Sequence, residues 1–262
     1  MSAAYENIMI ERQGAAFVVT LARAEKLNPI DWATIKELRS AIAEIDASDA
    51  LAVILTGSGR SFSAGGDLDG YIALYQDKAR FRAFLDDFFA MLDEIERSTK
   101  IYIAAVNGVC VAGGLELLLA CDISIAADTA KIGDGHLNFG QLPGAGGSQR
   151  LPHAIGLLRA KHLILSGKLL TAVQAAEIGL VGEVVPAAEL MFAAAAWVET
   201  LAEKSPVGVR GAKYLTNLTL TMPMEQGLKA EMDYVHNYAT TEPDATEGLI
   251  AFRDKRKPEF GK

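Results

Sequence analysis

Short, almost continuously apolar runs alternate with segments of helical periodicity between residues 27 and 128 of this chain. The clearest runs are LAVILTG (residues 51–57) and IYIAAV (residues 101–106). A strand with apolar side chains on both faces has to be covered on both faces, which is typical of parallel strands inside an α/β sheet. The alternation therefore predicts an α/β fold built around a buried parallel sheet.

The neighbouring segments complete this pattern. Residues 6–21 are rich in β-branched residues around Gly14 and predict a hairpin. Residues 27–46, with Pro29 in the first turn and Asp31 near the start, and residues 81–98 carry apolar positions at helical spacing. Residues 57–68 and 107–114 follow strands and are expected to be loops, and residues 115–121 are expected to form a helix before a strand at 122–128.

The pattern changes after residue 150. Five helical segments follow, separated by Gly, Pro and short polar turns, and LVGEVVP (residues 180–186) is the one strand-like run among them. We therefore expect an α/β core in residues 1–199 and a helical C-terminal region in residues 200–262 that packs on the core or on a neighbouring subunit.

Composition narrows the classes of function. The chain has 262 residues, of which 50% are hydrophobic and 22% charged, which is typical of a globular protein with a full-sized core. Its net charge of -8 argues against nucleic acid or an anionic membrane as the main partner. The two cysteines have no metal-site spacing, no apolar run reaches the roughly 20 residues of a membrane span, and no signal peptide is evident. We expect a cytoplasmic protein without a metal site.

Two glycine pairs stand between a strand and a helix, in SAGGDL (residues 63–68) and CVAGGLE (residues 110–116). Ligands bind at this end of the strands in parallel α/β sheets. Glycine pairs leave backbone N–H groups unshielded, and two such groups directed at one point form an oxyanion hole. Taken singly, each pair favours an ordinary tight turn over an oxyanion hole. Neither pair has the spacing of a nucleotide phosphate loop.

Glu116 is the one charged residue in the apolar stretch that follows the second glycine pair. An unpaired carboxylate in an apolar interior costs several kcal/mol or takes up a proton, which raises its pKa. A raised pKa near neutrality suits a general acid or base. The alternative is that Glu116 caps the N-terminus of its own helix.

Taken together, these motifs resemble the crotonase, or enoyl-CoA hydratase/isomerase, superfamily. The resemblance lies in residues 61–68, 103–128, 140–156, 170–186 and 252–260, in the family's order, and covers nearly the whole chain. It implies a crotonase-type fold of repeated ββα units with a helical C-terminal part. It also implies that the backbone N–H groups of Gly66 and Gly113 hold an acyl-CoA thioester oxygen, and that Glu116 is a catalytic carboxylate.

The chain departs from the hydratase pattern at the second catalytic acid. Alignment on Gly140 puts His136 at that position. A neutral imidazole is able to accept or donate a proton near neutral pH, or His136 merely lines the pocket. If residues 133–137 are extended, Asp134 projects to the same face as His136 and orients its ring. Gly144 stands where other members carry an acid, which disfavours dienoyl isomerisation and aryl dehalogenation.

The resemblance also assigns the contacts with coenzyme A, which is the thiol part of the substrate, so that no separate cofactor is expected. The candidate residues for these contacts are Arg23, Lys26, Ala64, Gly66, Asp67, Leu68, Gly113, Lys255 and Lys257. The last two are candidates from a neighbouring subunit. Residues 71–88 border the acyl pocket or form an ordinary core-facing helix. A homotrimer or a dimer of trimers is the habit of the family, and residues 200–262 are the expected trimerisation region.

These features favour hydration of a 2-enoyl-CoA that is polarised by the oxyanion hole. Three alternatives stay open: double-bond isomerisation by Glu116 alone, carbon–carbon bond hydrolysis with His136, and binding of coenzyme A esters without catalysis. His153, His162 and His236 belong to no constellation and are expected to be structural.

Overall fold

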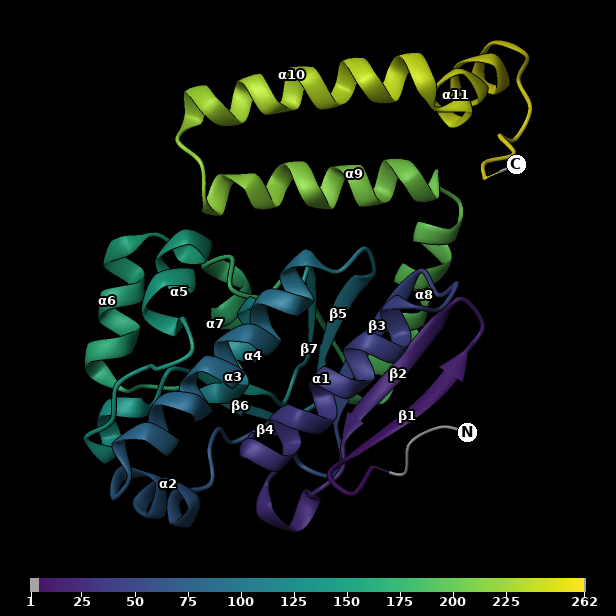
Figure 1. The fold of residues 1–262 in the computed structure, drawn as a ribbon. Coiled ribbons are helices and arrows are strands. Elements are labelled where there is room, and N and C mark those ends of the chain that lie inside the picture. The colour runs from purple at the N-terminus through teal and green to yellow at the C-terminus, as the bar shows by residue number, and fades with distance from the viewer. Residues whose placement is uncertain (1–4, 262) are drawn as a thin grey trace.

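The computed structural model describes residues 5–261. The chain begins with the expected hairpin, in which β1 (Ile8–Gln13) pairs antiparallel with β2 (Ala16–Leu21). Parallel pairing then continues through β3 (Ala52–Gly57), β5 (Ile101–Val106), β7 (Ile123–Ala127) and β10 (Glu183–Val185). The result is a six-stranded sheet of order β1-β2-β3-β5-β7-β10 (Figure 1).

A second, smaller sheet has the order β4-β6-β8-β9. It consists of the short strands β4 (Ser61–Ser63), β6 (Val109–Val111), β8 (Lys131–Gly133) and β9 (Leu170–Thr171). The first three are parallel, and β9 is antiparallel to β8. Residues 57–68 and 107–114 were expected to be loops without strands, and this was wrong, since β4 and β6 lie in them. Three-residue strands are too short for a hydrophobic period to be visible.

The two sheets arise from a repeated ββα unit, as the resemblance implied. The pairs β3-β4, β5-β6 and β7-β8 each give their first strand to the large sheet and their second to the small one. Helices α2 (Leu68–Tyr75) and α3 (Lys78–Arg97) follow the first pair, and α4 (Gly113–Leu119) follows the second. The third pair leads into the 3-10 helix η2 (His136–Phe139) and α5 (Gly147–Ile155).

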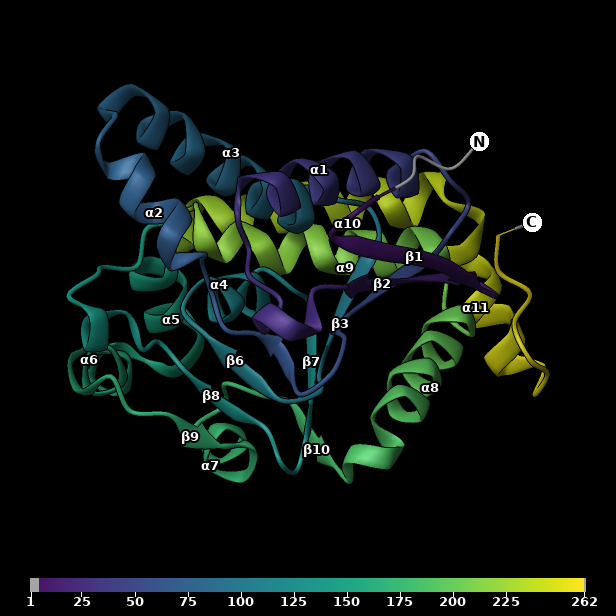
Figure 2. The same ribbon diagram turned by 90° about the horizontal axis from the view of Figure 1, so that it is seen from below.

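Helices cover both faces of the large sheet, which explains why every residue of β3 and β5 is buried. On one face α1 (Trp32–Asp46) and α3 pack into a core that includes Ile35, Phe88 and Leu92. On the other face α8 (Leu190–Ala202) packs against Ile54 and Ile103 (Figure 2). Helix α1 begins at Trp32 with Asp31 as its N-cap, so Pro29 precedes the helix instead of lying in its first turn.

Helices dominate after β8, as expected. Besides α5 and α8, they are α6 (Leu157–Ser166), α7 (Ala172–Glu177), α9 (Pro206–Asn217), α10 (Met224–Thr241) and α11 (Pro243–Arg253), with the one-turn 3-10 helices η3 (Ala187–Glu189) and η4 (Leu218–Leu220). A further one-turn 3-10 helix, η1 (Ala24–Lys26), precedes α1. Lys213 of α9 anchors this part by donating to the carbonyl oxygens of Ile95 and Lys100, each at 2.9 Å. A domain boundary after residue 199 and a role of residues 200–262 in trimerisation stay predictions.

Helices α10 and α11 lie beyond α9 as seen from the sheet (Figure 1). Between residues 5 and 261, none of the helices combines the length and apolarity that crossing a membrane requires.

Candidate active site

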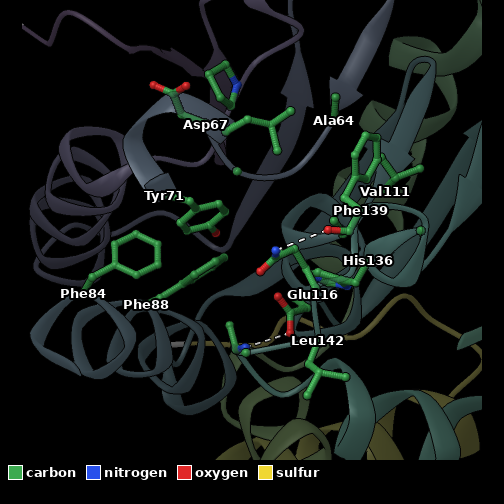
Figure 3. Close-up of a pocket in the computed structure, with 18 of the residues that line it drawn as sticks. Ala64, Asp67, Tyr71, Phe84, Phe88, Val111, Glu116, His136, Phe139 and Leu142 are labelled. Atoms are coloured by element: carbon green, nitrogen blue, oxygen red, sulfur yellow. Dashed lines mark hydrogen bonds between the residues drawn. The ribbon is translucent and has the colours of Figure 1, made fainter. Parts of the chain in front are cut away.

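A cavity of about 760 Å³ opens where the two glycine loops, α2, α3 and the segment before α5 come together (Figure 3). Glu116 and His136 both line it, as does Gly66. The strand ends that carry the glycine loops belong to the ββα units, so the fold itself brings residues about 50 positions apart to one place.

The two glycine loops touch each other at Gly65 and Gly113. Gly65 has φ +94°, and a Cβ atom on it would lie 2.7 Å from the Cβ of Ala112 and 3.3 Å from the nitrogen of Gly113. Only glycine permits this approach. Gly113 is the first residue of α4, where N–H groups have no partner inside the helix. Within the part of the chain that the structure describes, the N–H groups of Gly66 and Gly113 donate no hydrogen bond.

Ala112 holds a strained backbone conformation immediately before Gly113, with φ 52° and ψ -120°. A non-glycine residue in such a region costs on the order of 1–3 kcal/mol and persists only where its surroundings enforce it. The N–H of Ala112 donates to the carbonyl oxygen of Asp134 at 2.9 Å, which holds the turn against the neighbouring loop. This turn fixes the direction of the Gly113 N–H. Nothing in the sequence signals it, since alanine rarely adopts the conformation.

Glu116 is buried, with 2% of its surface exposed. Its Oε1 accepts hydrogen bonds from the N–H groups of Ala145 at 2.8 Å and Gly147 at 2.9 Å (Figure 3 shows the first). Its Oε2 accepts none from residues 5–261, and the side chain does not cap its own helix. Burial raises the pKa of Glu116 against the lowering effect of the Gly147 donor, the charge of His136 and the Ala145 donor.

The loop that holds Glu116 is itself held by a partly buried ion pair. Arg150 of α5 donates to the carbonyl oxygen of Ala145 at 2.8 Å and binds both carboxylate oxygens of Glu96 at 2.6 and 2.9 Å. This bidentate geometry fixes the guanidinium and with it the loop. The sequence analysis did not single out Arg150 or the two N–H donors, although the glycines of PGAGG (residues 143–147) signal a tight turn there.

His136 and Asp134 form the expected pair. Nδ1 of His136 lies 3.0 Å from Oδ2 of Asp134, and the backbone N–H of His136 donates to Oδ1 of the same carboxylate at 3.2 Å. The premise of an extended segment was wrong, because Gly135 has φ +68° and η2 begins at His136. The two side chains meet through this turn instead of through strand alternation.

The environment of His136 favours its protonated form. Burial lowers its pKa, but the hydrogen bond and charge of Asp134 and the charge of Glu116 outweigh this, so that the pKa is raised above 6.5. Because the carboxylate of Asp134 accepts from Nδ1, the other ring nitrogen, Nε2, is left for the cavity. Figure 3 shows the imidazole beside the carboxylate of Glu116. The cavity therefore holds a carboxylate and an imidazole with pKa values that depend on each other.

Aromatic rings form the opposite wall of the cavity, on α2 and α3. The rings that line it are those of Tyr71, Tyr75, Phe81, Phe84 and Phe88. Tyr71 packs edge to face on Phe84 with 5.4 Å between centroids, and Tyr75 packs likewise on Phe81 at 4.8 Å. Residues 71–88 thus border the pocket and belong to the core at the same time, so both interpretations of this segment hold.

A family model described as "Enoyl-CoA hydratase/isomerase" matches residues 11–262. The chain belongs to the enoyl-CoA hydratase/isomerase family. The resemblance carried by the glycine loops and by Glu116 is confirmed over nearly the whole chain, and the protein is an enzyme of this family.

Individual relatives agree with the family. A probable enoyl-CoA hydratase of Mycobacterium bovis is 40% identical over 257 residues, which cover 98% of both chains. A crotonyl-CoA hydratase of Syntrophomonas wolfei is 34% identical over 260 residues, again 98% of both chains. The crystal structure of an enoyl-CoA hydratase from Bacillus anthracis superposes with a TM-score of 0.91 at 34% identity and covers 97% of this chain and 99% of its own. The crotonase-type fold is therefore confirmed.

Among the residues that the family resemblance assigned to coenzyme A, Gly113 is not part of the cavity lining, although its neighbour Ala112 is. The others fall into three groups. The first lines the cavity: Lys26, Ala64, Gly66, Asp67 and Leu68. Arg23 does not line it, because its guanidinium is ion-paired with Asp31, the N-cap of α1. Lys255 and Lys257 follow α11, at the end of the molecule away from α2 in both ribbon views (Figures 1 and 2). No contact of these two with the cavity of their own chain is found among the described residues.

The three remaining histidines do not take part in the site. His153 of α5, His162 of α6 and His236 of α10 are absent from the cavity lining. Their side chains also make no hydrogen bond or ion pair within residues 5–261. All three are exposed, and their structural role stays a prediction.

Proposed function

We propose that the protein adds water across the double bond of a 2-enoyl-CoA thioester. The observation that carries the proposal is that Glu116 and His136 line one cavity with Gly66, and that Glu116 Oε2 and the second ring nitrogen of His136 have no partners among the described residues. Gly113 follows Ala112 of the cavity wall and lies against the loop of Gly65. The relatives from Mycobacterium bovis and Syntrophomonas wolfei, which are named as hydratases, support it.

The glycine loops polarise the thioester in this proposal. The N–H groups of Gly66 and Gly113 donate to the thioester oxygen, where negative charge develops as the β-carbon is attacked. Donors that are fixed before the reaction need no reorganisation during it. The strained turn at Ala112 keeps the second donor in place.

Glu116 and His136 share the proton transfers. The carboxylate of Glu116 removes a proton from water as the water oxygen bonds to the β-carbon, and the π electrons move toward the thioester oxygen to give an enolate. The protonated imidazole of His136 then delivers its Nε2 proton to the α-carbon. Asp134 stabilises the imidazolium before this transfer. The products are the 3-hydroxyacyl thioester, a protonated Glu116 and a neutral His136, and the two residues recover their charges by proton exchange with solvent.

The part of the substrate that the protein binds outside the reacting bond, coenzyme A, is inferred from the family. In this proposal an acyl-CoA enters past Lys26 and Ala64, Asp67 and Leu68 border it, and the reaction needs no cofactor besides the coenzyme A of the substrate. Contacts of Arg23 with the phosphates require its release from Asp31. Contacts of Lys255 and Lys257 require a neighbouring subunit, in a homotrimer or a dimer of trimers. We expect the enzyme to act in the cytoplasm.

A panel of short, long, branched and aryl 2-enoyl-CoA thioesters tests the function. The conjugated absorbance should fall, and mass spectrometry should find a product heavier by one water. A shifted double bond without a mass change would instead identify an isomerase that uses Glu116 alone.

The Asp134–His136 pair favours one second candidate, hydrolysis of a carbon–carbon bond in a β-dicarbonyl thioester. There the same imidazole would activate the water. Cleavage of such a substrate into one carboxylic acid and a shorter acyl-CoA thioester, together with an inert enoyl panel, would replace hydration with this reaction.

A further inference from the structure

The ring of Tyr71 lies directly on the first glycine loop. A Cβ atom on Gly66 would lie 2.1 Å from Cε2 of Tyr71 and 2.5 Å from its hydroxyl oxygen. Any side chain at position 66 would therefore displace the ring. The ring is held from behind by its edge-to-face contact with Phe84, so its position against Gly66 is a packed one.

The hydroxyl of Tyr71 has no partner. It makes no hydrogen bond with any residue between 5 and 261, although the side chain is largely buried and lines the cavity. Figure 3 shows the oxygen on the side of the ring that faces the cavity and Glu116. The neighbouring tyrosine on α2 differs, since the hydroxyl of Tyr75 donates to Oε1 of Gln141. Tyr71 thus presents a donor that the protein leaves unused.

The distance to the backbone donor is bounded by covalent geometry. Because a Cβ atom is two bonds from the backbone nitrogen of its residue, the nitrogen of Gly66 and the hydroxyl oxygen of Tyr71 lie at most about 5 Å apart. One oxygen atom at about 2.9 Å from each can accept from both. A thioester oxygen bound to the Gly66 N–H is therefore within reach of the phenol.

We propose that the hydroxyl of Tyr71 is a third hydrogen-bond donor to the thioester oxygen and stabilises the enolate together with Gly66 and Gly113. This inference rests on the proposed oxyanion site. It adds a side-chain donor to a site that otherwise consists of backbone groups alone.

The charge state of the phenol suits this role. Burial raises the pKa of Tyr71, and the negative charge of Glu116 raises it further. The hydroxyl therefore keeps its proton at neutral pH and donates a hydrogen bond to the developing oxyanion. Since a phenol is a stronger donor to an anion than to a neutral carbonyl, the bond strengthens toward the enolate.

The variant Tyr71→Phe tests the proposal, because it keeps the ring that packs on Gly66 and Phe84 and removes only the hydroxyl. We expect hydration kcat to fall about 100-fold with little change in KM, the usual effect of losing one oxyanion donor. Tyr214→Phe is the matched control, since it removes a hydroxyl from α9 outside the cavity and should leave kcat unchanged.

A second readout does not depend on hydration. Acetoacetyl-CoA, a thioester that enolises, should show the near-ultraviolet absorbance of its enolate when bound to the wild-type protein, and Tyr71→Phe should reduce that absorbance at saturating ligand. If the wild type hydrates no thioester but this loss is seen, the role of Tyr71 stands and the proposed function falls. Full turnover and full enolate absorbance in Tyr71→Phe, or a rise in KM alone, would overturn the role of Tyr71.

Discussion

Glu116 and His136 face the same cavity but are held in opposite ways. Backbone N–H groups of Ala145 and Gly147 hold the carboxylate of Glu116, which is almost fully buried. A side-chain carboxylate, that of Asp134, holds the imidazole. The first arrangement depends on the path of a loop, and the second on the identity of a single residue.

This difference has a consequence for charge. Neutral N–H donors stabilise the ionised form of Glu116 without adding a charge, and burial still raises its pKa. Asp134 brings a full negative charge to His136, and together with Glu116 it raises the pKa of the imidazole despite burial. An addition of water needs a base beside an acid, and in the proposed mechanism Glu116 is the base and His136 is the acid. Substitutions of Glu116, His136 and Asp134, made one at a time, test these two roles separately.

The largest effect is expected from Glu116→Gln. The amide oxygen still accepts from Ala145 and Gly147, so the fold is retained, but no base remains. Hydration kcat should fall about 1,000-fold, within the usual range for one acid or base. Steady-state kinetics with a thermal melt check this. Glu177→Gln, an exposed change at the end of α7, is the matched control. Near-normal turnover with an intact fold would remove Glu116 from the mechanism.

A smaller loss is expected from His136→Ala. Water of the cavity replaces the imidazole as a weaker proton donor, so kcat should fall about 100-fold. The basic limb of the pH profile should vanish with the imidazole. His153→Ala, an exposed change on α5, should alter neither quantity. Unchanged kcat in His136→Ala would reduce this residue to a part of the pocket wall.

The smallest effect is expected from Asp134→Asn, which keeps the shape of the partner and removes its charge. The pKa of His136 should fall, because Asp134 supplies the hydrogen bond and the larger share of the charge that raise it. Turnover near neutral pH should fall about 10-fold, the equivalent of one pKa unit of lost stabilisation. Histidine proton NMR or the basic limb of the rate profile measures the shift. If the basic limb of the rate profile stayed at the same pH, Asp134 would have no effect on the pKa of His136.

The sequence predicted the parts of this site that rest on composition. Apolar runs predicted the buried sheet, the glycine pairs predicted the two loops, and the solitary charge of Glu116 predicted a buried carboxylate. These predictions were possible because each position accepts few other residue types. A close approach of two backbones, for example, requires glycine.

Other parts depended on the path of the backbone and could not be predicted. Ala112 has a positive φ that its side chain does not favour, and only the neighbouring loop enforces it. The pairing of Arg23 with Asp31 occupies a residue that was predicted to bind phosphate, and no sequence signal pointed to this pairing. Asp134 reaches His136 because Gly135 is left-handed, which the assumption of a strand missed. Local geometry of this kind is set by tertiary contacts instead of by propensity.

The most direct test of the shared acid and base is the pH dependence of kcat/KM for hydration by the wild-type enzyme. The account predicts two limbs: activity rises with pH as Glu116 ionises, above the 4.5 of an ordinary glutamate, and falls as His136 loses its proton, above the 6.5 of an ordinary histidine. A profile with the acidic limb alone, flat to high pH, would contradict the participation of His136 and leave Glu116 to act by itself.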